Sequence, residues 1–321
     1  MKSCTTVPPD ISNEDIQKHL KLRGEGKIQT LFQSPSRPNA LFVLSKSDVG
    51  VCRNGGRRGS NFAPDAILAI FKNFMLPKKW QSLHFASQEI SNVQDELEHF
   101  DTAQENAANR WLGLLQAMTT VKRFIHLGGG HDHIYPLLLG LSKQYDGVTI
   151  VNIDAHCDTR NDGWHHSGTP FRQFAKTSKI PFTLIQLGIH AFANPDSNYQ
   201  KLEQGEMQVI PFAQLQADKS PKHKETFQAI FEQALAKGPL VLSLDADGIS
   251  ASEMEAVSSV NPQGLGINDV TEILCGLKLA QKLYPQTPIF FGIYEYNPIY
   301  DNLSQKGSRA LAYLIYNFLD N

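Results

Sequence analysis

Short and nearly uninterrupted apolar runs recur along the chain. They occupy residues 41–45, 123–127, 148–153, 183–189, 240–244 and 289–294. Most of these runs are continuous rather than alternating, which is typical of strands that are covered on both faces in a parallel sheet. The pattern therefore predicts six buried parallel strands.

Helical periodicity fills the intervals between these runs. Residues 268–281 place four apolar side chains on one face, with Asn268 as the expected N-cap, and the last segment repeats the pattern with Leu311, Leu314, Ile315 and Phe318. Strands and helices alternate over the whole length without a Pro/Ser-rich linker. We therefore expect an α/β protein with a single doubly wound parallel sheet, helices on both faces, and one domain over 1–321. The polar stretch 195–223 is predicted to be a surface loop.

Composition narrows the class of protein. The 30 basic and 32 acidic residues give a net charge of −2, which argues against nucleic acid and against an anionic membrane surface as partners. The apolar runs are too short to cross a bilayer, and the N-terminus lacks the apolar core of a signal peptide. The four cysteines are scattered without a CxxC pair, so no disulfide framework or zinc ribbon is indicated. We expect a cytoplasmic protein.

Three of the predicted strands end in side chains that commonly bind metals. The run 123–127 leads into "GGGHDH", 148–153 leads into "DAHCD", and 240–244 leads into "DAD". In doubly wound sheets, sites form in the crevice outside the carboxyl ends of the strands. We therefore expect six side chains to meet at one edge of the sheet: His131, Asp154, His156, Asp158, Asp245 and Asp247.

Each motif also has a purely structural interpretation. The glycine turn before His131 could cradle a phosphate, although it does not complete GxGxxG, and His131 could simply begin a helix. Asp245 could be a helix N-cap. The run "DAHCD" decides between the interpretations, because burying two carboxylates and an imidazole without a positive partner costs several kcal/mol. Cys157 should point away from its neighbours and pack in the core.

The ligand types indicate which metal is bound. Four carboxylates with only two imidazoles form a harder set than the His/Cys sets that zinc prefers, and they suit Mn²⁺, with Co²⁺ or Ni²⁺ as alternatives. Six ligands are more than one ion needs. Two ions that share carboxylates would use them all, and a water bridging the ions would become a nucleophile at neutral pH.

With these residues in place, the chain resembles the ureohydrolase (arginase–agmatinase) family over nearly its whole length. The resemblance is carried, in this order, by "GRRGSNFAPDAI", "GGGHD", "NIDAHCD", "SLDAD" and "YEYNP". It implies an arginase-like three-layer sandwich and two Mn²⁺ ions per chain. The implied ligands of one ion are His131, Asp154, Asp158 and Asp245, and those of the other are His156 and Asp247 together with the shared Asp154 and Asp245. Family members often form closed oligomers, so a homo-oligomer is expected.

Details within the family favour one branch. "GGGH" and "SGTPFRQ" at 167–173 are similar to formimidoylglutamases, and "GIHAFAN" at 188–194 is a weaker likeness. This implies hydrolysis of the linear amidine N-formimidoyl-L-glutamate to L-glutamate and formamide, a late step of histidine breakdown, by a metal-bridging hydroxide. Glu295 would then pair with the amidinium, and Asp158 would carry the proton to the departing nitrogen. Arg160 and Arg172 are the candidates for binding the substrate carboxylates.

One segment departs from the family pattern. Residues 251–264 read "ASEMEAVSSVNPQG", with Glu255 and Ala256 where Pro and Gly are expected. This leaves open a different small-molecule substrate, namely agmatine, arginine or a guanidino acid. A non-catalytic binding protein of the same family is a further alternative, although all six ligand residues are present. A two-metal phosphatase would be expected to carry Asn-rich metal motifs, which this chain lacks.

Overall fold

Eight parallel strands form one sheet in the computed structural model, which describes residues 12, 14, 18, 26–33, 37–217 and 223–320, with only the backbone of 223 and 224. Across the sheet the strands run in the order β2-β1-β3-β8-β7-β4-β5-β6. Their bounds are Ala40–Lys46 (β1), Phe85–Asn92 (β2), Arg123–Leu127 (β3), Val148–Ile153 (β4), Phe182–Ile189 (β5), Gly205–Pro211 (β6), Leu240–Asp245 (β7) and Ile289–Tyr294 (β8). The sheet confirms the predicted fold class.

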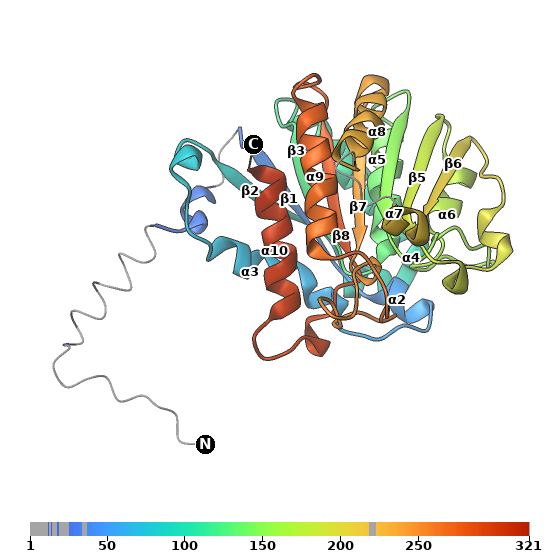
Figure 1. The fold of residues 1–321 in the computed structure, drawn as a ribbon, viewed down its shortest axis with the longest axis horizontal. Coiled ribbons are helices and arrows are strands. Elements are labelled where there is room, and N and C mark those ends of the chain that lie inside the picture. Colours follow the sequence, from blue (N-terminus) through green and yellow to red (C-terminus); the bar gives the residue numbers. More distant parts are fainter. Residues whose placement is uncertain are drawn as a thin grey trace, which may run out of the picture.

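Helices cover both faces of the sheet and complete a three-layer sandwich (Figure 1). One apolar core joins the sheet to α3 (Ala63–Lys72), α7 (Phe212–Ala217), α8 (His223–Lys237), α9 (Ile267–Gln281) and α10 (Lys306–Leu319). A second core on the opposite face joins it to α4 (Val93–Ala117), α5 (Ile134–Ser142) and α6 (Pro170–Thr177). The short helix α2 (Val49–Arg53) lies at the end of the sheet where the strands finish (Figure 1).

All six predicted strands are present, and the two that were not predicted are the edge strands β2 and β6. Residues of β6 alternate between half-buried and exposed, so this strand lacks a continuous apolar run. The prediction of a loop over 195–223 is therefore wrong in part, because β6 and α7 lie within it. Residues 218–222 of that stretch are outside the described residues.

The predicted helix at 268–281 is α9, but Asn268 is not its N-cap. The cap is Gly266, whose backbone N–H donates to Asp269 Oδ2 at 2.8 Å. The carboxylate three residues on thus satisfies a backbone donor that has no partner within the helix. The terminal helix α10 buries the predicted apolar face.

The structure bears on two further features, the membrane-spanning potential of the helices and the state of the cysteines. None of the helices in the described part of the chain is both long enough and apolar enough to span a membrane. Cys52, Cys157 and Cys275 are free thiols, whereas Cys4 lies outside the described residues. Cys157 is fully buried, as predicted for a packing residue.

The register of the four central strands brings their carboxyl ends to one level. Leu127 of β3 pairs with Ile293 of β8, which pairs with Leu244 of β7, which in turn pairs with Ile153 of β4. Neighbouring strands lie about 4.8 Å apart. The residues that follow these four therefore begin from adjacent points along one edge of the sheet.

Candidate metal centre

The segments after these four strands supply the candidate site. His131 begins the 3₁₀ turn η4 (His131–His133) after β3, and Glu295 follows β8. Asp245 ends β7, and Asp247 lies in the 3₁₀ turn η7 (Ala246–Gly248). Asp154, His156 and Asp158 follow β4.

The glycine turn before His131 serves close packing. A Cβ on Gly129 would lie 1.8 Å from the carbonyl oxygen of Ser47, so only glycine fits there. Gly128 N–H donates to Ile293 O, and Gly130 N–H donates to Ser47 O. These two amides are thus committed to the backbone, which argues against the alternative of a phosphate cradle.

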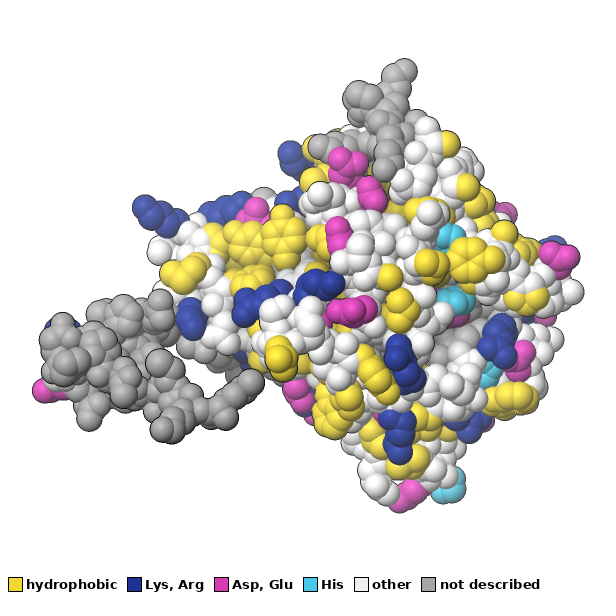
Figure 2. Space-filling model, turned by 60° about the horizontal axis from the view of Figure 1, so that its bottom comes forward, with side chains coloured by type: hydrophobic (Ala, Val, Ile, Leu, Met, Phe, Trp, Pro, Cys, Tyr) yellow, Lys and Arg dark blue, Asp and Glu magenta, His cyan; other side chains and the backbone are white. Residues whose placement is uncertain are grey.

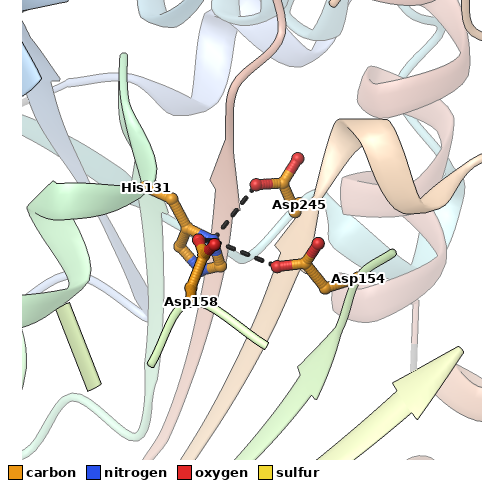
Figure 3. Close-up of side chains that lie close together, drawn as sticks. All are labelled: His131, Asp154, Asp158 and Asp245. Carbon is orange, nitrogen blue, oxygen red and sulfur yellow. Dashed lines mark ion pairs between the residues drawn. The ribbon is translucent and has the colours of Figure 1, made fainter. Parts of the chain in front are cut away.

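Three carboxylates converge on one nitrogen of His131 (Figure 3). Its Nδ1 lies 2.8 Å from Asp158 Oδ2, 3.1 Å from Asp245 Oδ2 and 3.3 Å from Asp154 Oδ2. His131 and Asp154 are fully buried, and the other two are nearly so. We call these four residues the first cluster.

A second cluster adjoins the first and consists of Asp154, His156 and Asp247. His156 Nδ1 lies 3.1 Å from Asp247 Oδ2 and 3.6 Å from Asp154 Oδ1. Asp154 therefore takes part in both clusters, one oxygen in each. Asp245 takes part only in the first, and its Oδ1 accepts from Asp247 N–H at 2.8 Å. It is thus also the N-cap of η7, as one interpretation of the sequence allowed.

The electrostatics show a site that is short of positive charge. Burial raises the pKa of Asp245 well above its usual range, with repulsion from Asp247 and Asp154 adding to the effect, and it raises the pKa of Asp247 to about 7. Burial opposes a charged His131, yet the three carboxylates close to Nδ1 raise its pKa well above the ordinary value. Carboxylates held together in this way call for cations.

The protein also fixes which nitrogen of His131 faces the carboxylates. Nε2 lies 2.8 Å from Ser243 Oγ, and Tyr294 stacks on the ring at 4.9 Å between centroids. Nδ1 is buried, and among the described residues no hydrogen bond reaches it. Such an imidazole, held from behind and surrounded by carboxylate oxygens, fits a divalent transition-metal ion.

Two residues of the site adopt the left-handed backbone conformation, which is unfavourable for residues that carry a side chain. Asp158 has φ 51° and Glu295 has φ 62°. Left-handed conformations are uncommon for residues other than glycine and cluster at functional sites. Glu295 is 6% exposed, and its Oε1 accepts from His131 N–H at 3.0 Å. The carboxylate of Glu295 is therefore tied to the residue that begins the first cluster.

A cavity of about 710 Å³ opens onto both clusters. Asp158, His156, Asp247 and Glu295 are among its lining residues. Among the described residues that line it, Arg160 is the one lysine or arginine. Figure 2 views the end of the molecule at which the strands finish, where histidine side chains show among basic and apolar ones.

Arg160 is positioned by two neighbours that the sequence did not single out. Its Nη1 donates to Asn54 Oδ1 at 2.6 Å, and its Nη2 is paired with Asp162. All three residues line the cavity. These two contacts hold the guanidinium of Arg160 at the wall of the cavity.

Arg172 does not line the cavity, and the prediction that it binds substrate is not supported. Its guanidinium is buried and donates to three backbone carbonyls, those of Thr159, Gln200 and Lys201. Because its Nε, Nη1 and Nη2 atoms are all engaged in this way, Arg172 joins two loops of the protein.

Ser243 is a site residue that the sequence analysis missed. Its signal was its spacing, because Ser243 lies two positions before Asp245 in a strand, and alternate residues share a face. A hydroxyl at that position, among apolar residues, indicates a hydrogen-bond partner for a polar side chain, which in the structure is His131.

The segment 251–264, whose sequence differs from the family pattern, packs against the cavity. Ala256 and Val257 are buried, Asn297 N–H donates to Ala256 O, and Arg57 N–H donates to Ser258 Oγ at 2.9 Å. Ser258 and Ser259 reach the cavity lining. The segment therefore contributes hydroxyl groups to the site.

Comparison with known proteins matches the model of the Arginase family to residues 48–320. The chain is 28% identical over 293 residues to formimidoylglutamase of Staphylococcus aureus (strain bovine RF122 / ET3-1), which covers 90% of this chain and 88% of the relative. It is also 28% identical over 296 residues to formimidoylglutamase of Enterobacter sp. (strain 638), covering 89% and 88%.

Solved structures share the fold. Trypanosoma cruzi formiminoglutamase with Mn²⁺ superposes with a TM-score of 0.72 at 22% identity, covering 91% of this chain and 96% of that one. Formimidoylglutamase of Bacillus subtilis gives a TM-score of 0.75 at 18% identity, covering 100% and 94%. The arginase-like sandwich is thereby confirmed.

Proposed function

Because the chain belongs to the Arginase family, whose model matches residues 48–320, we propose that it is a hydrolase that cleaves N-formimidoyl-L-glutamate to L-glutamate and formamide. The names of the curated relatives support this substrate, which belongs to histidine degradation. The observation that carries the proposal is the charge pattern of the cavity. It has a buried carboxylate, Glu295, beside the two clusters and a single arginine, Arg160, among its described lining residues.

The donors of the site fit two Mn²⁺ ions. His131, Asp154, Asp158 and Asp245 would hold one ion, and Asp154, His156 and Asp247 would hold the other. When bound, two such ions supply Lewis acidity and lower the pKa of water toward neutrality. The remaining steps are derived from the side chains of the chain itself.

Glu295 is proposed to orient the amidinium of the substrate. Burial raises the pKa of this carboxyl well above its usual range, and repulsion from Asp245 adds to the effect. A cationic amidinium would offset both influences and favour the charged carboxylate. Because charge-assisted hydrogen bonds are directional, the pair would hold the planar carbon at a fixed angle.

Asp158 is proposed to move the proton that the leaving nitrogen requires. One of its oxygens faces His131, and the residue also lines the cavity, so its carboxyl joins the first cluster to the substrate space. Burial and the nearby Asp154 raise its pKa, which favours the protonated form that can donate to the leaving nitrogen.

Arg160 is proposed to bind a substrate carboxylate. Formimidoylglutamate carries two carboxylates and agmatine carries none, so an arginine on the cavity lining favours the former. The Asn54 and Asp162 contacts limit the rotamers of Arg160, which lowers the entropy lost on binding.

The experiment is a comparison of kcat/KM on four substrates for the Mn²⁺-loaded protein. We expect formimidoylglutamate to exceed agmatine, arginine and a guanidino acid by at least tenfold, because a polar group left unpaired in a binding site costs about 1–3 kcal/mol. Glu295→Gln should lower the rate on every substrate. A preference for agmatine or arginine would contradict the proposed substrate.

A further inference from the structure

A third group of buried ligand-type side chains lies outside the cavity. It consists of Glu96 on α4 and of Asp132 and His133 on η4, and their ligand atoms lie within 4.8 Å of one another. All three are at most 2% exposed. None of them lines the cavity described above, so they form a separate cluster.

The tautomer of a neutral His133 is set by its surroundings. Its Nε2 lies 3.1 Å from the carbonyl oxygen of Ser47, and because a carbonyl only accepts, Nε2 must carry the hydrogen. In the neutral ring, Nδ1 then presents a lone pair. That lone pair faces Glu96 Oε1 at 3.6 Å, so two acceptors face each other in a buried place.

No direct hydrogen bond joins these two atoms. A charge-assisted hydrogen bond from an imidazolium would bring the atoms to about 2.7–2.9 Å. Among the described residues, no hydrogen bond reaches His133 Nδ1 or either oxygen of Glu96. Burial raises the pKa of the Glu96 carboxyl to about 7, although the nearby His133 acts in the opposite direction.

The separation of 3.6 Å between His133 Nδ1 and Glu96 Oε1 leaves room for one ion bound by both atoms. Tetrahedral bonds of 2.0–2.2 Å place neighbouring ligand atoms about 3.3–3.6 Å apart. In the two clusters of the candidate centre, the imidazole nitrogens lie between 2.8 and 3.6 Å from the carboxylate oxygens, so the separation in the third group is the same as the longest of these. The charges also balance, because two carboxylates and a neutral imidazole offset one divalent cation.

We propose that Glu96, Asp132 and His133 hold a third divalent transition-metal ion, separate from the two of the catalytic centre. This ion would join the first turn of α4 to η4, the turn that begins with His131. Its role would be structural, since none of its ligands reaches the substrate space. The inference does not depend on which substrate the enzyme cleaves.

The test counts metals in the full chain. After loading with Mn²⁺ alone or with Zn²⁺ alone and removal of free metal, elemental analysis should find three ions per chain. Crystals measured at the absorption edge of the metal should show an anomalous peak between Glu96 and His133. Two ions per chain with either metal, and no peak at that place, would overturn the proposal.

Variants assign the third ion to its ligands. Glu96→Gln and His133→Asn should each hold two ions, with the peaks of the catalytic centre retained. The matched control is Glu98→Gln on the same helix, because Glu98 is exposed and accepts from Gln94, and this variant should keep three. Retention of all three ions by both Glu96→Gln and His133→Asn would contradict the assignment. If either variant fails to fold, the anomalous map of the unaltered protein decides.

Discussion

Ser243 Oγ lies 2.8 Å from Nε2 of His131, on the opposite side of the ring from the three carboxylates that surround Nδ1. A hydroxyl that accepts from Nε2–H fixes the tautomer in which Nδ1 is free to bind a metal. The strand β7 thus supplies both a candidate ligand, Asp245, and a hydrogen-bond partner for His131, the candidate ligand that follows β3.

Ser243→Ala should weaken Mn²⁺ binding at the first cluster about 10- to 100-fold, since partners that orient a metal ligand typically contribute this much. Equilibrium dialysis against Mn²⁺ measures the change. Ser243→Thr keeps the hydroxyl and should bind more tightly than Ser243→Ala. Equal affinities in the unaltered protein and Ser243→Ala would show that Ser243 does not orient His131.

Asp154→Asn should reduce the occupancy of both metal positions together, because one oxygen of Asp154 lies in each cluster. Activity should fall in parallel. Asp247→Asn is the control, and it should affect the second position alone. Elemental analysis with a rate measurement checks both variants, and an Asp154→Asn protein with two ions and normal turnover would exclude the shared role.

Asp158→Asn should separate metal binding from proton transfer. We expect a smaller loss of metal than in Asp154→Asn and a loss of rate of about 10²–10⁴-fold, which is typical for removal of a general acid–base group. The rate is to be measured at saturating Mn²⁺, so that occupancy does not limit it. A rate that recovers fully at high Mn²⁺ would leave Asp158 as a ligand only.

Arg160→Met and Arg172→Met should differ in kind. The first should lower kcat/KM on formimidoylglutamate about ten- to a hundredfold with little change in unfolding temperature. The second should mainly lower the unfolding temperature, because it leaves the carbonyls of Thr159, Gln200 and Lys201 without their donor. A selective loss of substrate specificity in Arg172→Met alone would reverse these assignments.

The metal-free protein should lose stability as the pH rises from about 4 through 7. The pKa of Asp247 is raised to about 7 in the folded chain, so the folded state binds this proton more tightly than the unfolded state. Asp245 and Glu295 shift in the same direction, as do His131 and His156. The lowered pKa of Asp154 acts only below this range.

Thermal unfolding in the presence of a chelator, followed from pH 5 to pH 8, measures this dependence. Added Mn²⁺ should raise the unfolding temperature most at the upper end of the range, because metal ligands bind when deprotonated. An unfolding temperature that rises steadily with pH in the chelator would contradict the electrostatic description of the site.

The central strands and the convergence of the candidate ligand residues could be predicted from the sequence, because burial on both faces leaves continuous apolar runs and the motifs follow directly after them. Two strands were missed for the opposite reason. The edge strands β2 and β6 each contain three exposed residues among half-buried or buried ones, so neither carries a continuous apolar run. The polar, partly exposed residues of β6 also explain why 195–223 was predicted to be a loop.

Arg172 shows where sequence spacing stops being informative. An arginine close to a site motif can point into the cavity or tie loops together, and only the hydrogen-bond partners distinguish the two roles. The prediction of the N-cap of α9 was wrong for a similar reason. Asn268 is a good capping residue, but the backbone turns at Gly266, where Asp269 supplies the acceptor.

Identifying the products formed from formimidoylglutamate tests the proposed hydrolysis directly. Water adds to a carbon that carries two nitrogens, and either of them could leave. We expect L-glutamate and formamide in equal amounts, in a reaction that depends on Mn²⁺ and is abolished in Asp154→Asn. Release of ammonia with N-formylglutamate, or no Mn²⁺-dependent product at all, would contradict it.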